Sequence, residues 1–398
     1  MRAYYVFLRD NVPYIGFGWL ITFFSSFGQT FLISLYVPEL ISAFGLTNGE
    51  FGTMYALSTI AASGIMLRFG PCVDYKPVRQ VTYFTVFGLA FSSFLLSMAY
   101  HPVLLVLALI GLRMTGQGMM SHISLTIISR YYDKDRGKAL SLASLGYSIG
   151  EAVFPLVITT LIVTMGWRWA AAASGVMLLM VLLPLLFRIN LEEFDQEENE
   201  PEQSNNRVRL LHYGYIFKNR LFTIIAPATF LLSFTSTGLF FYQLVIAKER
   251  GWPYEIYAVF FTAYAFTRLC FSLLGGNWID RFTAKRLFIF HLLPLFLSLL
   301  SLALVPGLAG AALFLLLMGI AVGLNNPIMS ALIAELFGIE RIGAVRSLFT
   351  MVMVISSALG PMLIGNAMDF GFEITSIALS IAALAMLVIL NGFRLSRK

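Results

Sequence analysis

The sequence predicts an all-α membrane protein of twelve transmembrane helices in two six-helix repeats, and three observations carry that prediction. Of the 398 residues, 58% are hydrophobic and only 12% are charged, whereas a soluble globular domain carries about 25% charged residues. Twelve apolar stretches are each long enough to cross a bilayer, and the last six repeat the spacing of the first six. This composition disfavours a soluble enzyme and a nucleic-acid-binding protein, and a disordered chain needs the opposite balance.

The positions of the spans follow from hydropathy. About 20 apolar residues cross the hydrocarbon core, where a helix satisfies its own backbone hydrogen bonds. The expected spans are 13–37, 51–69, 80–100, 103–129, 138–164, 168–187, 221–246, 254–278, 286–305, 309–333, 343–367 and 372–393.

The placement of lysine and arginine predicts the topology. Of 27 such residues, Arg113 and Arg268 fall inside spans, Arg168, Lys248 and Arg250 fall on one side, and the other 22 fall on the opposite side. Basic residues collect on the cytoplasmic side of a membrane. We therefore expect a multi-pass protein of the cytoplasmic (inner) membrane with both termini in the cytoplasm. The net charge of +6 then reports topology and gives no reason to expect nucleic acid as a partner.

The two halves are predicted to repeat one unit. A shift of 206 residues places Gly70 on Gly276 and Asp74 on Asp280 without a gap. The expected organisation is a six-helix half at 1–187, a cytoplasmic linker at 188–220 and a second half at 221–398. The linker is rich in Asp and Glu, which predicts a solvated, flexible segment. Transporters built from such repeats bind substrate between the halves, near the bilayer midplane.

The loops after the second and eighth spans share one motif. Both read G-x-x-x-D followed five residues later by a base, at Gly70, Asp74 and Arg79 and again at Gly276, Asp280 and Lys285. This pattern resembles the signature loop of the major facilitator superfamily, and the resemblance covers the whole chain.

The resemblance implies a conformational gate in which the aspartate pairs with nearby bases and a helix end. The implied gate residues are Gly70, Asp74, Arg79, Gly276, Asp280, Arg281 and Lys285. The first copy departs from the family pattern, because Tyr75 stands where a base is usual and Pro77 where glycine is usual. Its latch is expected to be the weaker one.

Three ionisable residues near the middle of spans are the main functional evidence. They are Arg113, Glu151 and Arg268, and the 206-residue shift places Gly319, Ser357 and Ala62 on them. Ionisable groups at this depth are costly and usually line a polar cavity. Because the scaffold repeats while the charges do not, we expect the charges to serve a ligand.

The arginine of the fourth span resembles a family element that is often tied to proton coupling. Arg113 has Gln117 one turn further along the same helical face. Glu151, which follows a G-x-x-x-G pattern, is the natural proton-binding candidate. The alternative is a fixed structural pair of Glu151 with Arg113, since buried charges need partners.

The arginine of the eighth span, Arg268, shares a polar helical face with Tyr264. It resembles the substrate-binding arginine of the monocarboxylate transporter and oxalate/formate exchanger branch, although it lies twelve residues before Asp280 where the pattern has about eight. The alternative is an arginine satisfied by helix-end carbonyls. Further polar candidates on spans 1, 7 and 10, which line the cavity in that family, are Gln29, Tyr242, Asn325 and Asn326.

Together these features predict a secondary transporter that works by alternating access, and more specifically a proton-coupled symporter of a small organic anion such as a monocarboxylate. Two arginines and one glutamate leave a positive cavity, and guanidinium matches the planar fork of a carboxylate. No cofactor, metal or catalytic residue is expected, and the partners are substrate, protons and lipid around a functional monomer. The alternatives are a carrier of drugs, siderophores or sugars and, from another class, a non-transporting receptor or membrane enzyme. A proline displaced to Pro155 weighs against a drug exporter.

Overall fold

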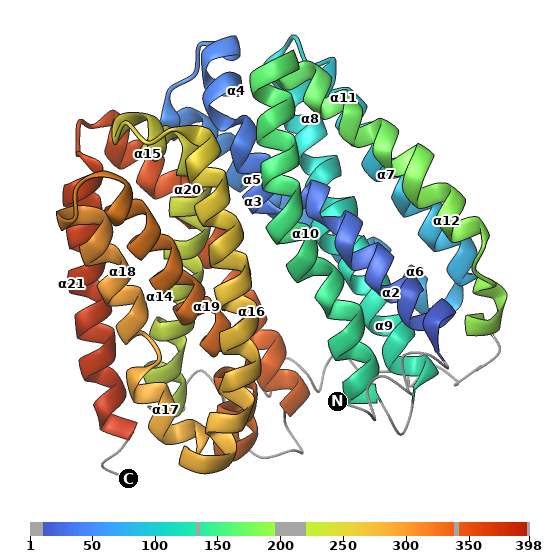
Figure 1. The fold of residues 1–398 in the computed structure, drawn as a ribbon. Helices are drawn as coiled ribbons and strands as arrows, with labels where there is room; N and C mark the ends of the chain where they lie inside the picture. The colour runs from blue at the N-terminus through green and yellow to red at the C-terminus, as the bar shows by residue number, and fades with distance from the viewer. Residues whose placement is uncertain (1–10, 133–135, 196–219, 338–341, 396–398) are drawn as a thin grey trace. The chain divides into compact units, whose positions relative to one another are not determined.

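A computed structural model describes residues 11–132, 136–195, 220–337 and 342–395 of the chain. Within these ranges the secondary structure is helical and contains no strand. The chain divides into two compact units (Figure 1). Unit 1 comprises Met1–Leu46 and Met54–Glu202, and unit 2 comprises Thr47–Thr53 and Gln203–Lys398.

Unit 1 contains the helices that correspond to the first six expected spans. They are α2 (Val12–Phe24), η1 (Ser25–Gly28), α3 (Thr30–Ile33), η2 (Ser34–Tyr36), α4 (Val37–Phe44), α5 (Asn48–Phe69), α6 (Cys72–Tyr75), α7 (Val78–Ser97), α8 (Pro102–Leu112), η3 (Arg113–Met120), α9 (Ser121–Tyr131), α10 (Arg136–Met165), α11 (Trp167–Met177), η4 (Leu178–Leu182), α12 (Leu183–Phe187) and η5 (Leu191–Asp195). The first turn of α5 is counted with unit 2.

Unit 2 contains the helices of the last six expected spans. They are α14 (Arg220–Phe241), α15 (Gln243–Glu249), α16 (Tyr254–Phe282), α17 (Ala284–Phe290), α18 (Leu293–Leu304), α19 (Gly307–Phe337), α20 (Ile342–Asp369), α21 (Ile374–Gly392) and η6 (Phe393–Leu395).

The number of strongly apolar spans is smaller than the twelve expected. Ten described helices are long and apolar enough to cross a membrane, and the bent pair Val12–Gly28 and Thr30–Phe44 makes up to eleven. The helix at the second expected position, α5, forms but does not meet that test. Polar side chains lower its mean hydropathy, and two of them, Ser58 and Thr59, are buried in the protein interior.

Unit 1 is organised around the crossing of α2 and α10, which run alongside each other (Figure 1). A Cβ on Gly150 would lie 2.8 Å from the carbonyl oxygen of Phe23, and a Cβ on Gly146 would collide with the carbonyl of Trp19. The G-x-x-x-G pattern of α10 therefore lets two backbones touch, as is common between membrane helices. The hydroxyl of Thr22 strengthens the crossing by donating to the carbonyl of Ala143 at 2.6 Å.

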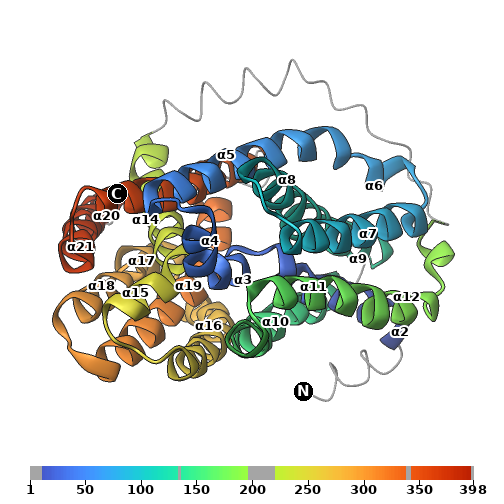
Figure 2. The same cartoon turned by 90° about the horizontal axis from the view of Figure 1, so that it is seen from above.

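Glycines also allow close backbone contact at two helix pairs of unit 2, α14 with α20 and α16 with α19 (Figure 2). Between α14 and α20, a Cβ on Gly360 would lie 2.5 Å from the carbonyl oxygen of Phe234. Between α16 and α19, a Cβ on Gly323 would lie 2.5 Å from the carbonyl oxygen of Arg268. Small residues thus fix the backbone of Arg268 against α19.

The first turn of α5 is held by α20 and by the junction of α14 and α15, all within unit 2. The carboxylate of Asp369 accepts the backbone N–H groups of Asn48 at 3.1 Å and Gly49 at 2.6 Å. The hydroxyl of Tyr242 donates to the carbonyls of Asn48 at 2.6 Å and Pro361 at 2.9 Å. The bonds to Asp369 satisfy N–H donors that a helix N-terminus leaves open, and the Tyr242 hydroxyl, with its one hydrogen, ties the carbonyls of Asn48 and Pro361 together.

The start of the linker differs from the solvated segment that the sequence predicts. The helical turn η5 packs on unit 1, where the ring of Phe194 lies 5.2 Å from that of Phe17 and 5.1 Å from that of Tyr131. Leu191 is buried, and the hydroxyl of Tyr14 donates to the carboxylate of Glu193. Leu191 and Phe194, two apolar side chains among the acidic residues, make these contacts. The high charge of the segment gives no indication of them. The rest of the linker, at 196–219, lies outside the described residues.

Candidate functional site

The first span is broken in its middle. Gln29 has an extended backbone, with φ −82° and ψ 150°, and separates η1 from α3. The two parts of the span are bent by 42°. Non-helical backbone at membrane depth is tolerated where it is buried in protein or lines a cavity. Gln29 is buried, and Thr30 begins the helix after the break.

The fourth span is irregular at the same level. Residues Arg113–Met120 form a π-helix, η3, between α8 and α9. A Cβ on Gly116 would lie 2.6 Å from the Cα of Gly28, and a Cβ on Gly28 would lie 2.9 Å from the backbone nitrogen of Gln117. Two glycines therefore let the wide π-turn lie directly against the break. Short π segments inside helices are frequent at functional sites.

Arg113 points from the π-helix toward this break. Its Nη1 donates to Oγ1 of Thr30 at 2.9 Å, and its Cζ lies 5.1 Å from the ring centroid of Tyr55. The Tyr55 hydroxyl donates to the same Thr30 oxygen at 2.8 Å. Tyr147 of α10 lies within electrostatic reach of the guanidinium. The side chain of Arg113 is only 5% exposed.

The partners of Arg113 are neutral. In the described parts of the chain no carboxylate lies within 4.0 Å of its guanidinium, and its Nε is buried without a hydrogen-bond partner. The fixed pair of Arg113 with Glu151, one of the alternatives from the sequence, is therefore not formed. Arg113 instead donates to the hydroxyl of Thr30, because the break in the first span brings that hydroxyl to the guanidinium.

Glu151 lies on α10 at the crossing with α2. It follows Gly150, which packs against the carbonyl of Phe23 and the hydroxyl of Ser26. Its side chain is only 3% exposed. Among the described residues, Arg113 and Glu151 are the only buried Asp, Glu, Lys or Arg side chains. Both belong to unit 1, and both lie next to the interrupted first span.

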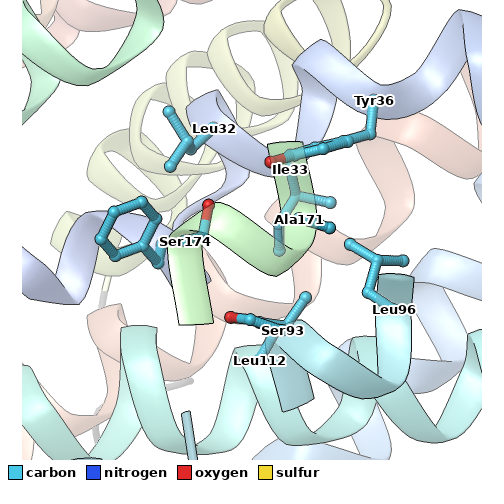
Figure 3. Close-up of a pocket in the computed structure, with 9 residues that line it drawn as sticks. Leu32, Ile33, Tyr36, Ser93, Leu96, Leu112, Ala171 and Ser174 are labelled. Atoms are coloured by element: carbon cyan, nitrogen blue, oxygen red, sulfur yellow. The ribbon is translucent and has the colours of Figure 1, made fainter. Parts of the chain in front are cut away.

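A small cavity in unit 1 lies between the broken first span and the helices α7, α8 and α11 (Figure 3). It is lined by Phe27, Leu32, Ile33, Tyr36, Ser93, Leu96, Leu112, Ala171 and Ser174. Its volume of about 10 Å³ is enough for about one water molecule. The hydroxyl-bearing Tyr36, Ser93 and Ser174 at its wall suit a water, and an organic substrate does not fit.

The candidates of unit 2 are distributed over several helices. Arg268 is half-buried, and Tyr264 lies buried in an aromatic cluster with its ring 4.9 Å from that of Phe240. Asn325 is half-buried with its Oδ1 enclosed and without a hydrogen-bond partner, whereas Asn326 is exposed. The two neighbouring asparagines of α19 therefore differ in exposure.

Tyr242, another candidate from the sequence, is fully buried at the junction of α14 and α15. Its hydroxyl is engaged by the carbonyls of Asn48 and Pro361. Because the single hydroxyl hydrogen of Tyr242 is occupied by these carbonyls, Tyr242 links helices and has no donor left for a substrate.

The predicted gate residues occupy loops and helix ends. Gly70 directly follows α5, and its N–H donates to the carbonyl of Met66 at 2.7 Å. Arg79 pairs with Glu192 at 3.4 Å, and both side chains are exposed. Surface pairs of this kind contribute about 0–1 kcal/mol.

The second copy of the gate lies at the end of α16. Gly276 and Arg281 are exposed and Lys285 is half-buried. The side chains of Asp74 and Asp280, with which the predicted latch would form, lie outside the described structure.

Sequence reasoning missed Thr30, Tyr55 and Tyr147. Thr30 follows Gln29 directly, and the polar character of the 51–69 stretch is visible in the sequence. Neither feature reveals which side chains meet across 83 residues of chain, the separation of Thr30 and Arg113. No group of three or more His, Cys, Asp or Glu side chains that could hold a metal ion occurs in the described ranges.

Comparison with known proteins gives one family. The family model of the Major Facilitator Superfamily matches residues 18–260 and 225–397. The chain is similar to the MFS transporter asaE of Aspergillus flavus, with 26% identity over 269 residues that cover 66% of this chain and 57% of that protein. It is also similar to monocarboxylate transporter 9 of Gallus gallus, with 30% identity over 180 residues that cover 42% of this chain and 34% of that protein.

The chain therefore spans less than two thirds of the length of these two relatives. Among solved structures, the nucleoside transporter NupG is similar with a TM-score of 0.77 and 13% identity, over 98% of this chain and 99% of that one. At that identity the likeness concerns the fold alone.

Proposed function

The chain belongs to the major facilitator superfamily and is a multi-pass membrane protein, and from this premise we propose that it is a transporter that carries a small organic anion together with protons. The proposed substrate class is a monocarboxylate, and the proposed mechanism is alternating access between the two halves. The proposed location is the cytoplasmic (inner) membrane with both termini in the cytoplasm, because 22 of 27 basic residues fall on that side of the predicted topology.

One observation carries this proposal, namely that Arg113 is buried among neutral partners. A guanidinium stays charged in a protein, and burying a charge without a counter-charge is costly. Thr30 and Tyr55 supply a hydroxyl and an aromatic face but no negative charge. An anionic substrate would supply it, and a carboxylate matches the planar donor fork of arginine.

Glu151 is our proposed proton carrier. It is the one buried carboxyl among the described residues and lies beside the same interrupted span as Arg113. Protonation of Glu151 would remove the one buried negative charge among the described residues of unit 1. Proton uptake would then favour binding of the anion, which is the order that symport requires.

Arg268 is our proposed second cation, in the other half. Its backbone packs against Gly319 and Gly323 of α19. This contact fixes the position of Arg268 along α19. The similarity to monocarboxylate transporter 9 agrees with a carboxylate substrate.

The test uses the purified full-length chain. We expect lactate or benzoate to raise its thermal unfolding temperature, because a ligand that binds only the folded state stabilises it by mass action. Glucose and uridine serve as neutral comparisons. The Arg113→Gln variant should lose the response to carboxylates, and the Arg188→Gln variant should keep it, because Arg188 is exposed. A response to the neutral solutes alone would overturn the proposal.

Proton coupling is tested in liposomes. The Glu151→Gln variant keeps the size of the side chain and removes its titratable group. We expect it to exchange labelled lactate across the membrane while an imposed pH gradient no longer drives accumulation. Accumulation that follows the gradient as in the wild-type protein would exclude Glu151 as the proton carrier.

A further inference from the structure

Thr30 occupies a special position in the candidate site. It is the first residue of α3 after the extended Gln29, so its side chain leaves the chain at the break itself. Its Oγ1 lies 2.9 Å from Nη1 of Arg113 and 2.8 Å from the hydroxyl oxygen of Tyr55. Both of these groups donate to it.

A count of donors and acceptors shows what Thr30 lacks. A hydroxyl has one hydrogen to donate and two lone pairs that accept. Arg113 and Tyr55 occupy both lone pairs, so the hydrogen of Thr30 must point to a third partner. Arg113 contributes one further unused donor, because its buried Nε has no partner. The described residues therefore place two donors, the Thr30 hydroxyl and the Arg113 Nε, in one site without an acceptor for either.

We infer that Thr30 is a direct ligand of the transported carboxylate, which would receive one hydrogen bond from the Thr30 hydroxyl and others from Arg113. This inference rests on the proposed transport of an organic anion. In it, Tyr55 is a positioning residue. Its hydroxyl fixes the orientation of Thr30, and its ring covers one face of the guanidinium.

The charge of the site selects the class of anion. Arg113 is the only buried Lys or Arg among the described residues of unit 1, and the other donor is a neutral hydroxyl. The single positive charge that unit 1 contributes matches one carboxylate group better than a dicarboxylate or a phosphate. The rings of Phe31 and Tyr147 meet edge to face at 5.9 Å and offer apolar surface close to Thr30 and Arg113 for the organic part of the substrate.

The experiment measures the affinity of the purified full-length protein for lactate and benzoate by titration calorimetry. Thr30→Val keeps the shape and removes the hydroxyl, and we expect affinity to fall about ten- to a hundredfold, as for a lost hydrogen bond to a charged group. Thr30→Ser keeps the hydroxyl and should stay within about threefold of the wild-type protein. The matched control is Thr85→Val, which removes a buried hydroxyl that only bonds the carbonyl of Val81 within its own helix.

The positioning role of Tyr55 is tested by a double-mutant cycle. Tyr55→Phe should weaken binding less than Thr30→Val does. If Tyr55 acts through Thr30, the double variant should bind no more weakly than Thr30→Val alone. A merely structural role would instead give additive losses together with a lower unfolding temperature in each single variant.

The outcomes separate this inference from the proposed function. Wild-type affinity in Thr30→Val, together with lost binding in Arg113→Gln, would overturn the role of Thr30 and leave anion transport standing. If the wild-type protein binds neither lactate nor benzoate, both proposals fall. Weak binding in Thr30→Val and near-normal binding in Thr30→Ser and Thr85→Val would support the inference.

Discussion

Replacing Arg113 by methionine should stabilise the protein while it abolishes transport. Removing a guanidinium from water costs several kcal/mol even after relaxation. Against this cost, the hydrogen bond to Thr30 contributes about 1.5–3 kcal/mol, and the contact with the Tyr55 ring contributes about 0.5–2 kcal/mol. Without a bound anion these contributions about balance the cost or fall short of it by a few kcal/mol.

The methionine side chain removes the charge and leaves few polar groups without a hydrogen-bond partner. The hydroxyl of Tyr55 still donates to Thr30 after the change, so the threonine oxygen keeps one partner. An unbranched thioether fills irregular space well. Replacing buried charges by apolar residues of similar volume is often neutral or stabilises by about 1–4 kcal/mol. For a chain of this length we expect a rise of about 2–6 °C in unfolding temperature.

The assay records thermal unfolding of detergent-purified protein without substrate, at one fixed heating rate because such unfolding is often irreversible. Arg168→Met is the opposite control. Arg168 donates to the carbonyls of Ser97 and Ala99 at 2.9 Å each, and its removal should lower the unfolding temperature. If Arg113→Met also lowers it by several degrees, Arg113 is a structural residue and the reasoning about a missing anion is wrong.

Three further predictions concern the scaffold. Asp369→Ala removes two hydrogen bonds from the first turn of α5 and should cost about 1–2 kcal/mol, with faster hydrogen exchange at the amide of Gly49; unchanged exchange there would contradict it. Gly116→Val forces a side chain onto Gly28 and should cost about 1–3 kcal/mol, seen as lower folded yield and unfolding temperature, whereas a wild-type yield would show that the crossing can open. Phe194→Ala removes the aromatic contacts of η5 and should speed limited proteolysis within η5; a wild-type cleavage pattern would show that η5 stays docked without it.

The sequence predicts the fold well because hydropathy and helical length act locally. All twelve expected positions carry helices, and α16 and α19 are found at 254–282 and 307–337 where spans 254–278 and 309–333 are expected. The acidic character of the linker hides the docking of η5, because two apolar residues among many charges leave no periodic pattern.

The site was predictable only in part, for a different physical reason. Arg113 and Glu151 stand out because charges are rare in apolar segments. Thr30 and Tyr55 do not stand out, because a hydroxyl is common in membrane helices and its partner is decided by the crossing of distant segments. The break at Gln29 has only weak local causes, since Ser25, Ser26 and Gly28 before it are poor helix formers.

The two halves differ in structure at the same place where they differ in charge. The 206-residue shift places Thr235 on Gln29, and α14 runs through Thr235 without a break. It places Gly319 on Arg113, and α19 is an ordinary α-helix there. The broken span, the π-turn and the buried arginine are therefore three departures from the repeat that meet at one point of unit 1. Packing alone gives no reason for them to coincide, since the second copy packs without any of them. A ligand that needs one arginine, one hydroxyl and an opened helix gives that reason.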